Sequence, residues 1–137
     1  MKLITRNTDY AIRALCYIAR QEKKEIVSVT RLNKVLKIPR PFLRKILQIL
    51  NQSGLIHSYK GMGGGFSLAK APKNISLTAL MQIFQGPLQL NECFFKKSIC
   101  PHMKSCILRS KITAIERYVL KELKTITIAT LLEEKRA

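Results

Sequence analysis

A helical pattern followed at once by a glycine-rich hairpin pattern is the strongest constraint on how this chain folds. Residues 40–51 place apolar side chains on one half of a helical wheel and polar ones on the other. Residues 55–60 then read as a strand, 61–65 as a turn with four glycines, and 66–69 as a returning strand. This order predicts a winged helix-turn-helix domain, which is mainly α with a small β-hairpin wing.

Two further helices are expected before this pair. Thr8 and Asp9 supply a hydroxyl and a carboxylate where a first helix would start. Ser28 is positioned to cap a second helix. Pro39 and Pro41 then end that helix and begin the next, because proline disfavours helical geometry in the residue before it and suits a first helical turn.

The polar half of the third helix carries side chains that suit DNA. Arginine matches guanine edges, glutamine matches adenine edges, and lysine mainly contacts phosphate. An ordinary amphipathic helix with a solvated basic face explains this helix alone equally well, but the hairpin after it favours a recognition helix with a wing. The glycine tip lets the backbone approach a phosphate or enter a minor groove. The residues expected to contact DNA are Ser28, Thr30, Arg40, Pro41, Arg44, Lys45, Gln48, Lys60, Gly63 and Gly64.

The charge distribution indicates a polyanionic partner. The chain has 25 Lys and Arg against 8 Asp and Glu, a formal net charge of +17. Between Glu25 and Glu92 there is no carboxylate, whereas nine Lys and Arg fall in that interval. Solvated surfaces usually mix their charges, so double-stranded DNA is the expected partner. An RNA-binding protein is less favoured, because the aromatic residues do not form a base-stacking platform.

Other classes of protein are disfavoured by absent patterns. The two histidines are isolated and no hydrolase or kinase motif is present, so no enzyme is expected. The glycines are not followed by Lys-Ser/Thr, which excludes a phosphate-binding loop. The N-terminus shows no signal-peptide core, and no apolar run reaches the roughly 18–20 residues of a membrane span. A cytoplasmic location without membrane contact is expected.

Three cysteines lie close together late in the chain. Cys93, Cys100 and Cys106 have the spacing C-x6-C-x5-C, and His102 follows the middle one closely. In a reducing compartment, such clusters more often bind metal or perform redox chemistry than form disulfides. Three thiolates are one ligand short of a tetrahedral zinc site or a four-cornered iron–sulfur cluster. Cys16 lies on an apolar helical face and is interpreted as a core residue.

The C-terminal region predicts a contact between two copies of the chain. Leu108, Ile112, Ile115, Val119 and Leu123 form an apolar stripe on a long helix, which is best explained as a dimer contact. A short helix is expected near residues 76–84, before the cysteines, and another near 127–132. The expected organisation is a DNA-binding domain over 1–73, a linking helix and cysteine loop over 74–106, and a dimerisation helix with C-terminal segment over 107–137.

Together these segments resemble the IscR/NsrR family of bacterial winged-helix transcription regulators. Residues 7–15 (NTDYAIRAL) are similar to the opening helix of that family, and residues 39–47 (PRPFLRKIL) to its recognition helix. Residues 61–69 (GMGGGFSLA) are similar to its wing. The three late cysteines stand where its cluster-binding members keep theirs. The resemblance covers nearly the whole chain, and its specificity comes from the pieces taken together.

The resemblance implies a homodimer that crosses on the long helix and binds palindromic promoter DNA. Cys93, Cys100 and Cys106 would be ligands of an iron–sulfur cluster that senses nitric oxide, redox state or iron–sulfur status. The histidine that completes a 2Fe–2S site in IscR-like members is replaced by Arg109. Asp9 matches the aspartate that NsrR-like members contribute from the partner subunit to a 4Fe–4S site, so 4Fe–4S is favoured over 2Fe–2S. The alternative is a winged-helix regulator that uses its cysteines as a zinc site or thiol redox switch.

Overall fold

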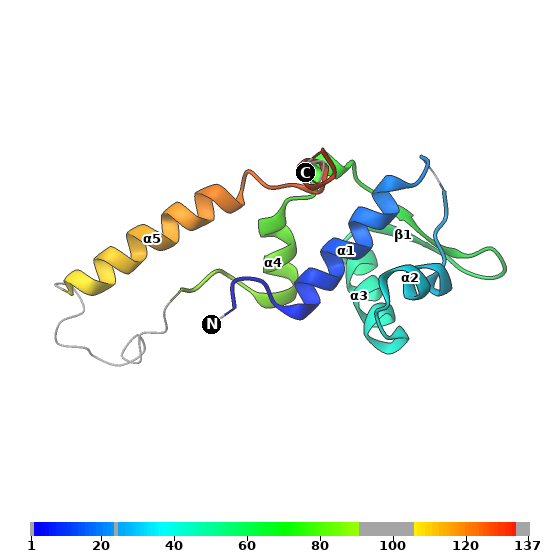
Figure 1. Ribbon diagram of the computed structural model, residues 1–137, viewed down its shortest axis with the longest axis horizontal. Coiled ribbons are helices and arrows are strands. Elements are labelled where there is room, and N and C mark those ends of the chain that lie inside the picture. The colour runs from blue at the N-terminus through cyan, green and yellow to red at the C-terminus, as the bar shows by residue number, and fades with distance from the viewer. Residues whose placement is uncertain (1, 24, 91–105, 134–137) are drawn as a thin grey trace.

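The chain is mainly helical with one β-hairpin, as the computed structural model shows (Figure 1). The structure describes residues 2–23, 25–90 and 106–133. The elements, in chain order, are α1 (Arg6–Arg20), α2 (Val29–Leu36), α3 (Arg40–Gln52), β1 (Ile56–Tyr59), β2 (Gly65–Leu68), the short 3-10 helix η1 (Pro72–Asn74), α4 (Leu77–Gln85), α5 (Ile107–Leu123) and α6 (Ile128–Glu133). The strands pair antiparallel, with Ile56 opposite Leu68 and Tyr59 opposite Gly65. The predicted fold class, winged helix-turn-helix with a long additional helix, is confirmed.

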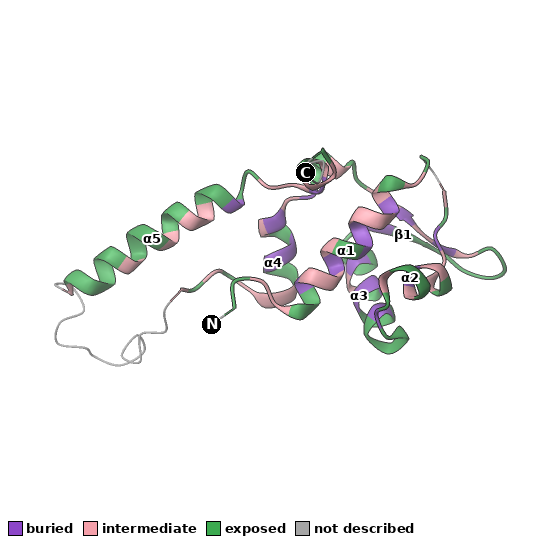
Figure 2. Ribbon diagram, viewed as in Figure 1, coloured by how far each residue is buried: buried purple, intermediate pink, exposed green. Residues whose placement is uncertain are grey.

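Helix α1 lies at the centre of the hydrophobic core and contacts α3, α4 and α6 (Figure 2). Ala11, Ala14, Leu15 and Ile18 are buried, because their spacing of three and four residues puts them on one face. They pack with the buried face of α3 and with Ile128 of α6. The core therefore joins the first and last helices of the described chain.

The start of α1 differs from the sequence expectation. The helix begins at Arg6, and Thr5 is its N-cap, with the Thr5 side chain accepting a hydrogen bond from the Thr8 N–H. Thr8 is completely buried, and its hydroxyl donates to Gln85 Oε1 at 2.7 Å. The same oxygen accepts from the Thr5 N–H at 3.0 Å. The predicted start at Thr8 was wrong because this partner lies 77 residues away in the sequence, where local pattern cannot reveal it.

The C-terminal region leaves the core and then returns to it. Helix α5 extends away from the rest of the molecule in Figure 1. The chain after it pairs with the segment before α4, through Leu77 N–H to Ile126 O and Ile128 N–H to Ile75 O, each at 2.9 Å. Ile128 is buried and α6 packs on α1 and η1. The predicted short C-terminal helix is confirmed, as is the helix after Ser76, whose hydroxyl accepts from the Ala79 N–H.

Lys37 adopts a left-handed conformation in the turn between α2 and α3. Its φ is 57° and ψ is 34°, and it forms the C-cap of α2. Residues with a Cβ carry a steric penalty there, whereas glycine does not. We expect Lys37→Gly to raise the free energy of unfolding by about 0.5–1 kcal/mol, measured by urea denaturation. Lys34→Gly, within α2, should instead lower it by about 1 kcal/mol. A loss of stability in Lys37→Gly would show that the lysine side chain itself holds the turn.

No helix in the described part of the chain is long and apolar enough to cross a membrane.

Candidate nucleic-acid interface and metal-ligating residues

Helix α3 separates a buried apolar face from an exposed polar one. Pro39 forms its N-cap and Pro41 lies in its first turn. One face is buried and consists of Leu43, Ile46, Leu47 and Leu50. The opposite face is exposed and carries five of the residues expected to contact DNA: Arg40, Pro41, Arg44, Lys45 and Gln48. Phe42, which the wheel placed on the apolar half, is 52% exposed because it lies at the edge of that half and the core does not reach it.

Helix α2 is held against α3 by short polar contacts. Ser28 is the N-cap of α2, and its side chain accepts from the Arg31 N–H at 3.1 Å, as predicted. Thr30, exposed on the next turn, accepts from Arg40 Nη2 at 3.3 Å. Asn33 Nδ2 donates to Ile38 O at 2.7 Å across the turn. The Thr30 contact joins α2 to α3 and the Asn33 contact joins α2 to the turn, an arrangement that a helix-turn-helix uses to present one helix to a groove.

The hairpin is anchored to the start of α2. Val27 and Phe66 exchange two backbone hydrogen bonds of 2.8 Å, so β2 continues the sheet onto the segment before α2. Lys60 follows β1 and is exposed, and Gly63 and Gly64 form the turn. The predicted wing therefore lies beside α2 and α3, with its loop projecting outward (Figure 1).

The side chain of Arg31, in α2, forms hydrogen bonds within the protein. Its guanidinium donates to Tyr17 Oη, Glu25 Oε1 and Gln21 Oε1, each at 2.8 Å. The hydrogen bond from Arg31 lowers the pKa of the Glu25 carboxyl, and Glu25 in turn raises the pKa of Arg31. Because the pKa of Glu25 falls on folding, this pair stabilises the fold at pH values above the usual pKa of glutamate. The stabilisation is lost as the pH falls through the lowered pKa of Glu25. Sequence reasoning missed this contact, because it depends on how α1 and α2 lie relative to each other.

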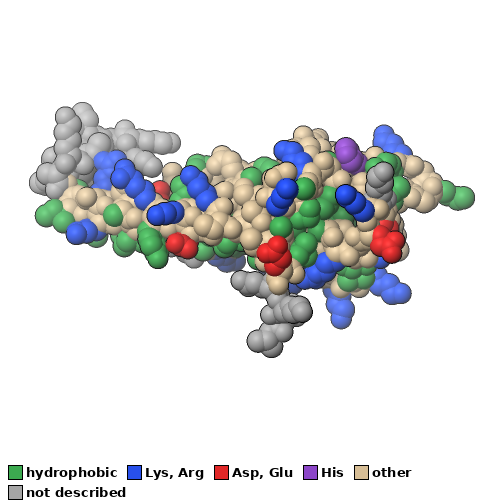
Figure 3. Space-filling model, turned by 90° about the horizontal axis from the view of Figure 1, so that it is seen from above, with side chains coloured by type: hydrophobic (Ala, Val, Ile, Leu, Met, Phe, Trp, Pro, Cys, Tyr) green, Lys and Arg blue, Asp and Glu red, His purple; other side chains and the backbone are tan. Residues whose placement is uncertain are grey.

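The remaining charges of the interface are exposed cations. Lys34, Arg40, Arg44, Lys45 and Lys60 are all exposed. Figure 3 shows Lys and Arg side chains along the α5 end and around the winged end of one face, with acidic side chains lying among them. The exposed cations of α2, α3 and the hairpin would attract the phosphates of DNA at long range.

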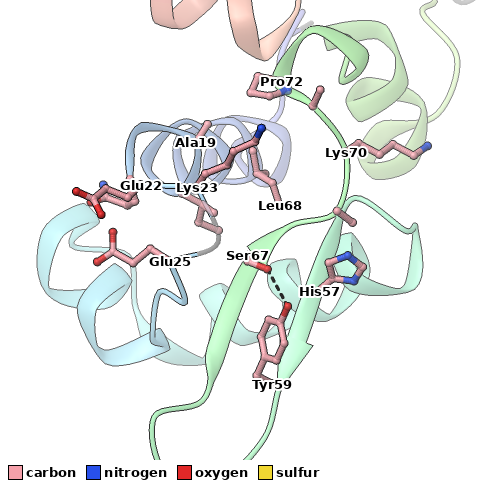
Figure 4. Close-up of a pocket in the computed structure, with 14 residues that line it drawn as sticks. Ala19, Glu22, Lys23, Glu25, His57, Tyr59, Ser67, Leu68, Lys70 and Pro72 are labelled. Atoms are coloured by element: carbon pink, nitrogen blue, oxygen red, sulfur yellow. Dashed lines mark hydrogen bonds between the residues drawn. The ribbon is translucent and has the colours of Figure 1, made fainter.

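A pocket of about 740 Å³ lies between the end of α1, the outer face of the hairpin and the segment after β2 (Figure 4). Tyr59 and Ser67 line it and are hydrogen-bonded to each other at 3.2 Å. Glu25 lines it as well and is engaged by Arg31. Tyr59, Ser67 and Glu25 are thus engaged by neighbouring side chains of the protein itself.

Cys106 is the one residue of the predicted cysteine cluster that the structure describes. It is the N-cap of α5, is partly exposed, and its Sγ accepts from the Arg109 N–H at 3.4 Å. Cys93, Cys100 and His102 lie outside the described residues. No group of three potential metal ligands is found within 2–23, 25–90 and 106–133. A helix N-terminus suits a negatively charged ligand atom, so a thiolate at Cys106 is compatible with metal binding.

Asp9 and Cys16 occupy different environments on α1. The side chain of Asp9 is 45% exposed, and its Oδ2 accepts from Arg13 Nε at 2.9 Å. Its carboxylate is therefore accessible to a second molecule but has an ion-pair partner within its own helix. Cys16 packs against the core, and burial raises the pKa of its thiol, an effect that Arg20 partly opposes. Cys16 thus lies in surroundings that disfavour the thiolate needed for metal binding.

An exposed cationic helix, a second helix locked against it and an adjoining glycine hairpin define a winged-helix DNA-binding protein. The chain belongs to the Rrf2 family, described as iron-dependent transcriptional regulators, whose family model matches residues 4–134. It is thus a transcription regulator and not an enzyme, and the predicted resemblance to IscR and NsrR is confirmed.

Curated relatives and solved structures agree with this assignment. The chain is 35% identical over 130 residues to a putative HTH-type transcriptional regulator of Aquifex aeolicus, covering 92% of this chain and 90% of that protein. It is 35% identical over 131 residues to the HTH-type transcriptional regulator NsrR of Halalkalibacterium halodurans, covering 89% and 90%. Its fold is similar to the global cysteine regulator CymR of B. subtilis, with a TM-score of 0.77 at 19% identity over 99% of this chain and 100% of that one. T. potens IscR gives a TM-score of 0.73 at 19% identity, covering 100% and 94%.

Proposed function

We propose that this chain is a cytoplasmic, homodimeric regulator that binds palindromic promoter DNA under the control of an iron–sulfur cluster. The observation that carries the DNA-binding part is the exposed face of α3, where Arg40, Arg44, Lys45 and Gln48 lie together opposite a fully buried face. Because the backbone of α3 is already ordered by its packing, only the side-chain rotamers have to be fixed when base edges are read. The wing and the cations around it then contact the flanking phosphates.

Arg44 is the best test of base reading. We expect Arg44→Ala to weaken binding to the preferred site by about 1–3 kcal/mol and to relax the sequence preference at particular base pairs. The measurement is fluorescence anisotropy with a site that the wild-type protein selects from random-sequence DNA. Lys73→Ala is the control, because it also removes one exposed positive charge but lies in η1, outside α3. An equal loss on every DNA sequence would reassign Arg44 to phosphate contact.

The dimer is proposed from the apolar face of α5. Leu108 is 66% exposed and Ile115 is 52% exposed, whereas Leu123 at the other end of the stripe is buried against α4. A single chain thus leaves the first part of the stripe in water. A second copy of α5 packed on it would remove this apolar surface from water and place two recognition helices on successive major grooves.

The sensing part rests on the chemistry of the cysteines and on the iron dependence that describes the family. Cys93, Cys100 and Cys106 would hold the cluster by their thiolates, and Asp9 of the partner subunit would complete the set. When bound, a cluster with one carboxylate ligand supplies an iron corner that nitric oxide or oxygen can attack. On the protein side, Asp9 lies in the first turn of α1, the central helix of the DNA-binding core. Release of the Asp9 carboxylate would therefore change how the two cores are held relative to each other.

Asp9→Ala tests the proposed fourth ligand. We expect the cluster to form with a changed visible spectrum and to be lost several times faster in air, because one corner is left without a protein ligand. The control is Arg13→Ala, which removes the ion-pair partner of Asp9 but keeps the carboxylate. An unchanged spectrum and unchanged stability in air for Asp9→Ala would remove Asp9 from the site.

A further inference from the structure

The tip of the wing is built almost entirely from backbone. Residues 61–65 read Gly-Met-Gly-Gly-Gly, so Met62 is the one side chain in the turn. The Gly64 N–H donates to Gly61 O at 3.0 Å, and Gly63, at the third position of this turn, has a φ of 75°. A turn of this kind requires a residue that tolerates positive φ at that position. Met62 therefore occupies the outward corner of a defined turn.

The neighbouring glycines cannot be replaced without moving the hairpin. A Cβ at Gly64 would collide with Tyr59 O, and a Cβ at Gly65 would collide with Val27 O. Backbone packing thus excludes side chains at Gly64 and Gly65, whereas at Gly61 and Gly63 the space is open and the positive φ favours glycine. Met62 is fully exposed, whereas Met81 in α4 is buried. Single exposed apolar side chains are common, so the informative feature is the combination of a thin tip with one long apolar side chain.

We propose that Met62 enters the minor groove beside the half-site read by α3 and makes DNA affinity depend on an apolar side chain at this position. This inference rests on the proposed DNA binding. A minor groove about 6 Å wide admits a ribbon without side chains more easily than an ordinary hairpin. Apolar side chains that enter this groove act as wedges between base steps, and methionine is flexible enough to fill an irregular gap.

The surroundings of the tip favour DNA as the occupant. Lys60 is exposed immediately before the turn, and no carboxylate occurs between Glu25 and Glu92. Phosphates on both sides of a minor groove would therefore meet cations and no acidic side chain from this segment. The anchoring of Phe66 to Val27 also fixes the hairpin relative to α2 and thereby to α3. The wing tip and the recognition helix would reach adjacent grooves of the same duplex as one unit.

The experiment compares three substitutions on a site selected by the wild-type protein from random-sequence DNA. Met62→Leu keeps apolar bulk and should bind within about twofold of wild type, whereas Met62→Ala and Met62→Gln should each lose about tenfold. The dependence of affinity on salt should stay the same in all three, because no phosphate contact is removed. Their thermal unfolding should also be unchanged, since the side chain is fully exposed.

A change in the DNA separates the minor groove from other contacts. Replacing guanine by inosine removes the N2 amino group, which is the minor-groove donor, and leaves the major groove unaltered. Inosine at the flanking steps should alter wild-type affinity but leave Met62→Ala unaffected. Wild-type affinity in Met62→Ala would overturn the proposal. Loss of binding in Arg44→Ala alone would leave the proposed function intact, whereas absence of any selected site for wild type would remove both.

Discussion

Ile115→Asp should convert the protein to a monomer and reduce affinity for a palindromic site by about a hundredfold or more. Ile115 lies in the middle of the exposed apolar stripe on α5, and its side chain is 52% exposed in the single chain. A carboxylate there costs the isolated chain little, because water can reach it. In a packed α5–α5 contact, the same charge would be buried without a partner, which is strongly unfavourable.

The expected loss of affinity for the palindromic site arises because a dimer binds two half-sites at once. A dimer places both recognition helices on DNA in one binding event, so the second half-site is bound at a high effective concentration. A monomer loses this advantage while keeping every DNA-contacting residue. Binding to a single half-site should therefore be nearly unchanged in Ile115→Asp, and this difference separates loss of the dimer from damage to α3.

Analytical ultracentrifugation measures the first effect and fluorescence anisotropy the second. Thr113→Asp is the matched control, since it introduces the same charge at an exposed position on the opposite side of α5. The control should remain dimeric and bind the palindrome like wild type. A dimeric Ile115→Asp protein would place the subunit contact elsewhere on the molecule.

Those parts of the fold that depend on local chemistry could be predicted from the sequence. Ser28 was predicted as a helix cap because a hydroxyl cap needs only the next three residues. The hairpin was predicted because glycines and alternating side chains also act locally. The start of α1 was not, because Thr5 and Thr8 are both suitable caps and the choice depends on Gln85, far away in the sequence.

In the candidate site, too, features set by local sequence could be predicted, whereas features set by contacts between distant residues could not. The exposed face of α3 follows from helical periodicity, and the structure places its polar residues in water as expected. The engagement of Arg31 by Tyr17, Gln21 and Glu25 could not be predicted, because it requires the angle between α1 and α2. A ligand contributed by a second subunit is harder still to predict, because residue spacing within one chain does not indicate which residues of another chain lie nearby.

Cys106→Ser should abolish stable binding of an iron–sulfur cluster, with iron and sulfide per subunit falling by about tenfold or more. The position of Cys106 makes this substitution unusually clean. Its Sγ caps α5 by accepting from the Arg109 N–H, and serine is among the preferred residues at this position. The substitution therefore keeps the helix start and removes only the thiolate.

Cys16→Ser is the matched control, because it removes one sulfur from a half-buried position in α1. Cys16→Ser should keep wild-type iron and sulfide after anaerobic purification, whereas Cys106→Ser should be colourless with an unchanged circular dichroism spectrum. A colourless wild-type protein with stoichiometric zinc would instead support the zinc site, and Cys106→Ser would then lose zinc. If both cysteine variants retained full iron and sulfide, Cys106 would not be a ligand, and its thiol would serve α5 only as a cap.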